Sequence, residues 1–192
     1  MLAGKGFDNI INVAGGIKAW DGQVAVGAED LGLELFTGKE SIDETLVVAY
    51  SLEAGLRDFY LSMIEKGTAE DIRHLFEKLS EIELKHQDRI FDMYLQVTGK
   101  KTAREAFDKE IVIQAVEGGL TTDEYINMFQ PDWNSAVDII SLAMSIEAQA
   151  LDLYTRAADR STEPHSVDAL KQIAAEERMH LEQLGKLMDA QA

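Results

Sequence analysis

The 192-residue chain contains no cysteine and only two prolines. Because it has no thiol, it cannot form disulfides, iron–sulfur clusters, cysteine-ligated zinc sites or a cysteine nucleophile. The scarcity of proline, together with abundant Glu, Leu, Ala and Ile, favours long helices. A chain without disulfides also suits a reducing compartment, so we expect a cytoplasmic location.

Basic side chains are few as well: 18 Lys and Arg stand against 35 Asp and Glu, and the formal net charge is −17. Nucleic acids and anionic membranes both require clustered positive charge, so we expect neither as a partner. No apolar run approaches the roughly 18 residues of a membrane-spanning helix. Residues 1–17 also lack the apolar segment of a signal peptide. Cations are the natural ligands of so acidic a protein.

From Ser41 onward, apolar side chains recur with a helical period and predict four long helices, over about 41–67, 69–97, 134–160 and 166–189. These stripes are expected to bury, among others, Val97 and Val137, and Met179 is expected to fill space in the core. The connection over 100–133 is too long for a tight turn and contains shorter helical pieces, at about 102–117 and 122–128. Two short-linked helix pairs joined by one long crossover predict an all-α four-helix bundle, with the crossover between helices 2 and 3.

Acidic and histidine side chains interrupt these apolar stripes. On the first helix the stripe 46, 50, 53, 57, 60 and 64 includes Glu53, and on the third the stripe 137, 140, 144, 147, 151 and 154 includes Glu147. The second and fourth helices each carry a Glu-x-x-His pair among apolar residues: Glu83 with His86, and Glu177 with His180. A Glu and a His three residues apart lie on one helix face, with Cβ atoms about 5–6 Å apart. Each pair is therefore close enough to hold one ion.

The chain also repeats itself at an offset of 94 residues, which maps the lone glutamates, the Glu-x-x-His pairs and two tyrosines onto one another. Packed antiparallel, the two halves would bring equivalent ligand sets to one place about a pseudo-twofold axis. That is a geometry for two metal ions. The alternative is an internal repeat whose polar groups pair with one another in the core, because a single Glu-x-x-His on a helix is usually solvated surface.

Charge favours the metal interpretation. Leaving a carboxylate in a low-dielectric core costs several kcal/mol. Arg57 and Lys85 lie near the sites, but two cations cannot neutralise four carboxylates. Two divalent ions would balance four ionised glutamates while the histidines stay neutral. Carboxylate and imidazole ligands without thiolate suit iron or manganese, and zinc is a plausible substitute, so we expect two iron ions as cofactor.

Two tyrosines follow the lone glutamates by two helical turns on the same face: Tyr60 and Tyr154. Each could donate a hydrogen bond to a ligand carboxylate. Each could equally be a core aromatic whose hydroxyl finds another partner, and the sequence leaves both interpretations open. The two other histidines, His74 and His165, are expected at the surface.

With these motifs, the region from about Ser41 to Asp189 resembles the ferritin-like superfamily, and within it the rubrerythrin and erythrin-type proteins with a bacterioferritin-like ligand set. The resemblance implies a ferritin-like bundle in a homodimer. It also implies terminal ligands at Glu53 and Glu147, bridging carboxylates at Glu83 and Glu177, and one histidine on each iron, His86 and His180. Rubrerythrins typically carry a further Glu on the third helix, where this chain has Met144, so no shift of iron between ligands is expected.

The segment Lys5–Trp20 looks like the last strand and helix of a rhodanese domain. The cysteine loop of that family is absent, which excludes sulfurtransferase activity in this chain. We expect residues 1–37 to be a non-catalytic rhodanese remnant with its linker, and residues 38–192 to be the di-metal bundle.

Three functions follow from these expectations. The leading one is a di-iron oxidoreductase that reduces peroxide or O2, as the rubrerythrin resemblance implies. Because the chain lacks a cysteine-bearing rubredoxin domain, its electrons would come from a separate donor protein. The second is a non-catalytic metal-binding or sensor module linked to sulfur metabolism. The third is a purely structural bundle.

Overall fold

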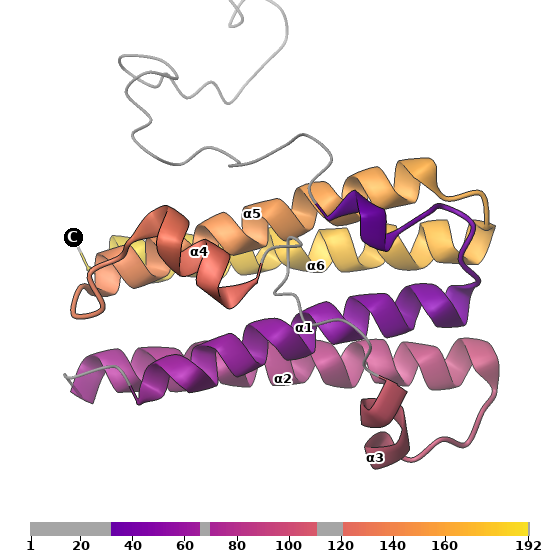
Figure 1. Cartoon of the computed structure of the whole chain (residues 1–192), viewed down its shortest axis with the longest axis horizontal. Coiled ribbons are helices and arrows are strands. Elements are labelled where there is room, and N and C mark those ends of the chain that lie inside the picture. The colour runs from indigo at the N-terminus through magenta and orange to yellow at the C-terminus, as the bar shows by residue number, and fades with distance from the viewer. Residues whose placement is uncertain (1–31, 66–69, 111–120, 192) are drawn as a thin grey trace, which may run out of the picture.

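The computed structural model describes residues 32–65, 70–110 and 121–191, and these are helical with no β-strand among them. Four long helices form the molecule: α1 (Ile42–Ile64), α2 (Glu70–Thr98), α5 (Ala136–Arg160) and α6 (Pro164–Asp189). Figure 1 shows them as two hairpins, α1 with α2 and α5 with α6, lying side by side. The predicted all-α, ferritin-like four-helix bundle is confirmed.

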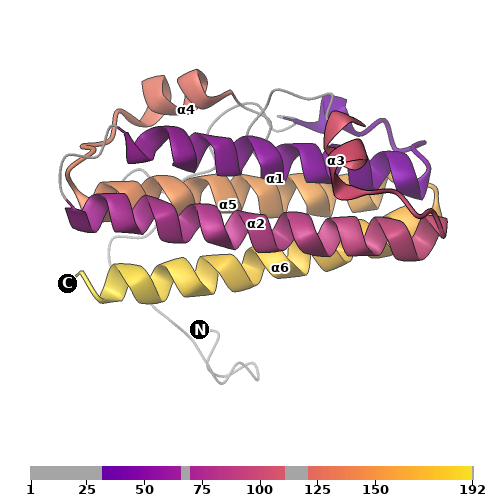
Figure 2. The same cartoon turned by 90° about the horizontal axis from the view of Figure 1, so that it is seen from below.

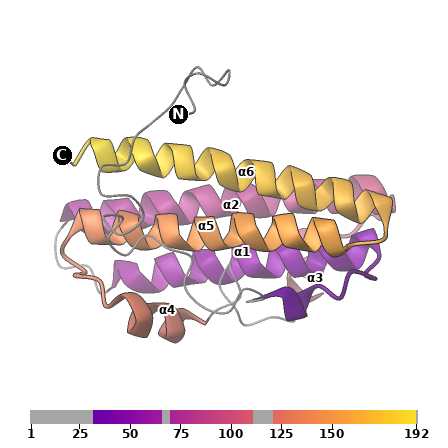
Figure 3. The ribbon, with the colours of Figure 1, turned by 90° about the horizontal axis from the view of Figure 1, so that it is seen from above.

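Short helices accompany the long ones: the 3-10 turns η3 (Leu33–Leu35) and η4 (Asp108–Glu110), and the helices α3 (Arg104–Phe107) and α4 (Thr122–Phe129). Figure 2 and, from the opposite side, Figure 3 show α3 and α4 toward opposite ends of the bundle. The helical piece predicted over 102–117 is one α-turn followed by a 3-10 turn as far as residue 110, and its remainder lies outside the described residues. The piece predicted over 122–128 is present as α4.

The two hairpins begin in matching ways. The offset of 94 residues that relates the halves of the sequence also relates the first residues of their helices, Ile42 to Ala136 and Glu70 to Pro164. A serine caps the N-terminus of the first helix in each half: Ser41 forms a capping box with Glu44, and Ser135 accepts a hydrogen bond from the backbone N–H of Asp138. The repeat in the sequence is therefore a repeat in the fold.

The interior consists of two apolar clusters. One contains Tyr94, Leu153 and Leu170 with their neighbours, and the other contains Phe76, Ile140 and Leu184 with theirs. Along every long helix, the ligand positions predicted from the sequence fall between residues of the first cluster and residues of the second. The core is thus divided by a polar layer, which is where a metal centre would have to lie.

Three side chains that were predicted in the interior are exposed instead: Val97 (43%), Val137 (45%) and Met179 (47%). Val97 and Val137 lie within two residues of a helix end, where the neighbouring helix no longer covers them. Met179 precedes His180 by one residue, and one residue turns the helix by about 100°, so an inward histidine leaves the methionine facing outward.

The segment before α1 packs on the bundle. Phe36 is buried in the first cluster, with its ring centroid 6.2 Å from that of Tyr154 in an edge-to-face arrangement. The rhodanese-like segment Lys5–Trp20 lies outside the described residues, so it stays a prediction, as does the domain boundary at residue 37. Among the described helices, none combines the length and the hydropathy needed to cross a bilayer.

Candidate metal centre

The first half of the bundle forms a buried triad. Glu53 comes from α1, and Glu83 and His86 come from successive turns of α2. All three are almost fully enclosed, with 1%, 1% and 4% of their surface exposed. The Nδ1 atom of His86 lies 2.9 Å from Oε2 of Glu83 and 3.3 Å from Oε2 of Glu53. One nitrogen and two carboxylates therefore converge on one point.

The second half forms the same triad from Glu147 of α5 and from Glu177 and His180 of α6. Here Nδ1 of His180 lies 3.1 Å from Oε2 of Glu177 and 3.4 Å from Oε2 of Glu147. In each triad, ligand atoms of the three residues lie within 4.8 Å of one another. The distances in the two triads agree to within 0.2 Å, as the sequence repeat requires.

The two triads meet at their histidines. The imidazole rings of His86 and His180 are stacked, with centroids 3.6 Å apart and planes inclined by 7°. This contact brings α2 and α6 together at the pseudo-twofold axis. All six residues predicted as ligands are thus gathered into one buried layer, which the stripe spacing and the 94-residue offset had predicted.

The charges of this layer come from four buried carboxylates and two imidazoles. Among the described residues, the ion pairs of Glu53, Glu83 and Glu147 are with the two histidines. Lys85 is exposed and Arg57 is half-buried. The Oε1 atom of Glu53 is buried and has no hydrogen-bond partner among the described residues. A buried oxygen with unused lone pairs is what a bound cation requires, so the residues fit a pair of metal ions.

The pKa values of the triads reflect the same crowding. Burial, together with repulsion from Glu147 and Glu53, raises the pKa of Glu83 well above its usual range. Burial lowers the pKa of His86, but the carboxylates of Glu53 and Glu83 outweigh it and raise that pKa to about 10. For Glu147, burial is outweighed by hydrogen bonds with His180 and Glu177, and its pKa is lowered. Without metal, the layer is therefore balanced by protons, which cations would displace.

Comparison with protein-family models matches residues 44–188 to the family described as Rubrerythrin. The chain belongs to the rubrerythrin family. A solved structure, Hypothetical Protein Pfu-1136390-001 from Pyrococcus furiosus, is similar at 23% identity over 78% of this chain and 89% of that chain, with a TM-score of 0.47. A comparison with curated proteins finds no match.

In this member of the rubrerythrin family, the remaining predicted residues lie as follows. Tyr60 and Tyr154 are buried in the second and the first apolar cluster, respectively, each one beside the polar layer. Their role as hydrogen-bond donors to ligand carboxylates stays a prediction. His74 and His165 are exposed and contact neighbouring glutamates, so both surface predictions are confirmed.

The sequence analysis did not predict two polar contacts next to the polar layer. Tyr50, one turn before Glu53, donates a hydrogen bond to Asp108 and accepts one from Nε of Arg104, both at 2.5 Å. In the second contact, Arg89 of α2 forms an ion pair with Glu176 of α6. The sequence repeat could have indicated both contacts. Each involves a residue that differs from its counterpart 94 positions away: Tyr50 from Met144, and Arg89 from Gln183.

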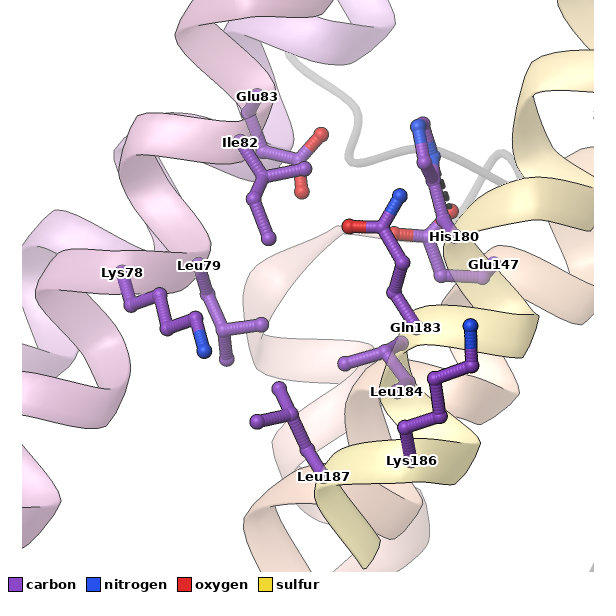
Figure 4. Close-up of a pocket in the computed structure, with 10 residues that line it drawn as sticks. All are labelled: Lys78, Leu79, Ile82, Glu83, Glu147, His180, Gln183, Leu184, Lys186 and Leu187. Atoms are coloured by element: carbon purple, nitrogen blue, oxygen red, sulfur yellow. Dashed lines mark ion pairs between the residues drawn. The ribbon is translucent and has the colours of Figure 1, made fainter.

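A cavity of about 240 Å³ lies between α2 and α6 on one side of the stacked histidines. Its inner end is formed by Glu83, Glu147 and His180, so it reaches both triads. Figure 4 shows the amide of Gln183 extending from α6 toward Glu83, and an ion pair joining His180 to Glu147. The family member thus has a buried ligand layer with a cavity at its edge.

Proposed function

We propose that the chain is a di-iron carboxylate oxidoreductase that reduces peroxide or O2 and is re-reduced by a separate electron donor. The observation that carries this proposal is the pair of equivalent buried Glu/Glu/His triads, face to face in a member of the rubrerythrin family. Neither a surface ion-pair network nor a structural polar layer needs two matched sets of inward, buried carboxylates.

The six residues of the two triads would together bind two ions. His86 and His180 would each hold one, Glu53 and Glu147 would complete the two ends, and Glu83 and Glu177 would supply the remaining two carboxylates. An iron pair bound there would supply two electrons and Lewis acidity. Manganese and zinc suit the same ligands, so the choice of iron rests on the family.

The protein surrounds this layer with apolar side chains. Clusters above and below it exclude bulk water from both triads, which strengthens electrostatic interactions in the site. Tyr60 and Tyr154 would be the side chains that donate a proton or a hydrogen bond to a ligand carboxylate. Reduction of hydrogen peroxide takes up two electrons and two protons and releases two waters.

The electrons must come from outside the chain, because its sequence has no cysteine for a rubredoxin-type centre. A reduced electron-transfer protein that delivers single electrons is the partner we propose. Met144 stands where rubrerythrins typically carry an additional glutamate, so we propose that the ions keep the same six ligands in both oxidation states. The resemblance to erythrin-type proteins supports a homodimer, and the absence of cysteine supports a cytoplasmic location.

Anaerobic loading with ferrous iron, followed by stopped-flow mixing with hydrogen peroxide or with O2, tests the proposal. We expect about two irons per chain and rapid oxidation. The double variant Glu83→Ala with Glu177→Ala should bind neither of the two irons. Two irons that stay inert would favour the metal-binding or sensor module instead, and unchanged metal content in the double variant would favour a structural bundle.

A further inference from the structure

The two sides of the stacked histidines differ where α2 meets α6. On one side Nη1 of Arg89 lies 3.5 Å from Oε2 of Glu176 and ties the two helices together. The offset of 94 residues maps Arg89 to Gln183 and Glu176 to Ile82. Gln183 and Ile82 carry no charge, so they cannot form the equivalent ion pair. The repeat is broken at both positions that would close the second side.

The cavity described above lies at this second side. Gln183 and Ile82 both line it, and beyond them its walls are aliphatic: Leu79, Leu184 and Leu187. In Figure 4 these leucine side chains occupy the space between the two helices. Two lysines, Lys78 of α2 and Lys186 of α6, also line the cavity, and Figure 4 shows them on opposite sides of the leucines. The cavity therefore combines the carboxylates of the triads, a hydrocarbon wall and two positive charges.

We propose that this cavity is the substrate passage, and that its preferred occupant is an aliphatic hydroperoxide that carries a carboxylate. The proposal rests on the function proposed above and names the substrate class of the same site. The hydroperoxide group would lie at the triads, the chain along the leucines, and the carboxylate at one of the two ammonium groups.

Charge complementarity argues for an anionic group. In a chain of net charge −17, two exposed lysines line one cavity, and the carboxylates that line it are those of the triads. Neither lysine forms an ion pair among the described residues, although acidic side chains outnumber basic ones about two to one. Lys78 and Lys186 are five and six residues from Glu83 and His180, or about 7–9 Å along the helices. A medium-length hydrocarbon chain spans that distance.

The reaction balances with the donor already proposed. The O–O bond of the hydroperoxide breaks, two electrons from the reduced electron-transfer protein and two protons are taken up, and one alcohol and one water leave. The carboxylate and the hydrocarbon chain are unchanged. The lysines are positioning residues: they touch the carboxylate and not the reacting oxygens.

Binding can be measured apart from turnover, with octanoate as a probe that has no peroxide group. The full chain, loaded with zinc so that no redox step interferes, is titrated with octanoate and with octanol by calorimetry. We expect octanoate to bind at least about tenfold more tightly than octanol, and this difference to vanish in Lys78→Gln with Lys186→Gln. The matched control, Lys85→Gln with Lys171→Gln, removes one charge from each of the same helices outside the cavity and should behave as the wild type. Equal binding of the two probes, or an equal effect of both double variants, overturns the proposal.

A second variant tests the broken repeat directly. Ile82→Glu with Gln183→Arg restores the counterpart of the Arg89–Glu176 pair on the open side. It should abolish octanoate binding while metal content and melting temperature remain those of the wild type. If octanoate still binds to this variant in its folded, metal-loaded form, the cavity is not the passage.

Turnover then separates this proposal from the proposed function. In the iron-loaded wild type, kcat/KM for a carboxylate-bearing alkyl hydroperoxide should fall at least about tenfold in Lys78→Gln with Lys186→Gln, while kcat/KM for hydrogen peroxide stays within about twofold. Octanoate binding without any peroxide reduction would refute the function and leave the binding site standing. Peroxide reduction that is indifferent to the lysines would refute the passage and leave the function standing.

Discussion

The two hairpins, α1 with α2 and α5 with α6, are built alike at the metal layer and differently around it. Both begin their helices at matching positions, and both contribute one Glu and one Glu-x-x-His with nearly equal distances. At other matching positions the residue types differ: Tyr50 corresponds to Met144, and Arg89 to Gln183.

These differences lie where the polar layer meets the rest of the molecule. In the proposed function two metal ions would need two equivalent ligand sets, and each half supplies the same three residue types. The proposed substrate passage and the contact of the crossover each need only one side, and the halves differ there. The comparison therefore separates the proposed ligands from the residues proposed to control access and stability.

The largest expected effect comes from the feature that both halves share. A ligand present at about 1,000 times its dissociation constant stabilises the folded state by about 4.1 kcal/mol. For a chain of this length, that corresponds to about 8–16 °C in melting temperature. We expect the iron-loaded or zinc-loaded protein to melt above the chelated protein by this amount, measured by calorimetry.

Single-site variants sharpen this prediction. Because the triads are equivalent, Glu53→Ala and Glu147→Ala should lower the metal content equally, and each should lose much of the metal-dependent gain in melting temperature. Equal melting temperatures with and without metal in the wild type would contradict the role assigned to the layer.

A smaller effect is expected where the segment before α1 packs on one hairpin only. The carbonyl of Gly38 accepts hydrogen bonds from N and Oγ1 of Thr162, at the turn between α5 and α6. Gly38 has a φ of 82°, and an added Cβ would lie 2.5 Å from the carbonyl oxygen of Arg160. A left-handed conformation costs an L-residue about 1–2 kcal/mol before that collision is counted. Gly38→Ala should therefore lower the melting temperature by about 4–8 °C.

The chain offers an opposite control in Gly185, which lies within α6 with open space around the position of its missing Cβ. Because alanine is favoured over glycine inside a helix by about 0.5–1 kcal/mol, Gly185→Ala should raise the melting temperature by about 1–4 °C. If both substitutions shift the melting temperature in the same direction, the packing assigned to Gly38 is wrong.

The sequence predicted the ligand layer well because its signals are local. Helical period fixes which side chains share a face, so Glu53 and Glu147 could be identified within their own stripes, and the repeat then paired them. The exposed residues Val97 and Val137 show the limit, because a stripe does not reveal where the neighbouring helix stops covering it. Contacts such as that of Arg104 with Tyr50 join residues 54 positions apart through a single-turn helix, which is too short to have a period.

That contact leads to a third prediction, about one position at which the halves differ. Tyr50→Phe removes the hydroxyl that joins Arg104 and Asp108, and so loosens α3 from the first hairpin. Two hydrogen bonds of about 1 kcal/mol each are lost, so the melting temperature should fall by about 4–8 °C. The counterpart, Met144→Leu, changes shape but no hydrogen bond and should be closer to neutral. A larger loss in Met144→Leu, by thermal melting of both variants, would contradict the difference drawn between the halves.

The smallest effect concerns the start of the second helix in each hairpin. Glu163 accepts a hydrogen bond from the backbone N–H of Ser166 and caps α6, whereas the matching residue of the first half is Ala69, which lies outside the described residues. That backbone hydrogen bond, against a small opposing effect of burial, lowers the pKa of Glu163 from 4.5 to about 2. A lowered pKa stabilises the folded state above the unfolded value, and the contribution is lost as the pH falls from about 4.5 to 2.

Glu163→Gln keeps an oxygen that can accept the hydrogen bond but cannot ionise, so it isolates the charge of the cap. The melting temperature of the wild type should exceed that of this variant at pH 7, and the difference should shrink to nothing by about pH 2. Glu182→Gln, which removes an exposed charge from the same helix without touching a cap, should show no such convergence over this window. A difference in melting temperature between wild type and Glu163→Gln that stays constant with pH would contradict this prediction. It would mean that the charge of Glu163 does not contribute to the cap, and that charge does not distinguish the starts of the two second helices.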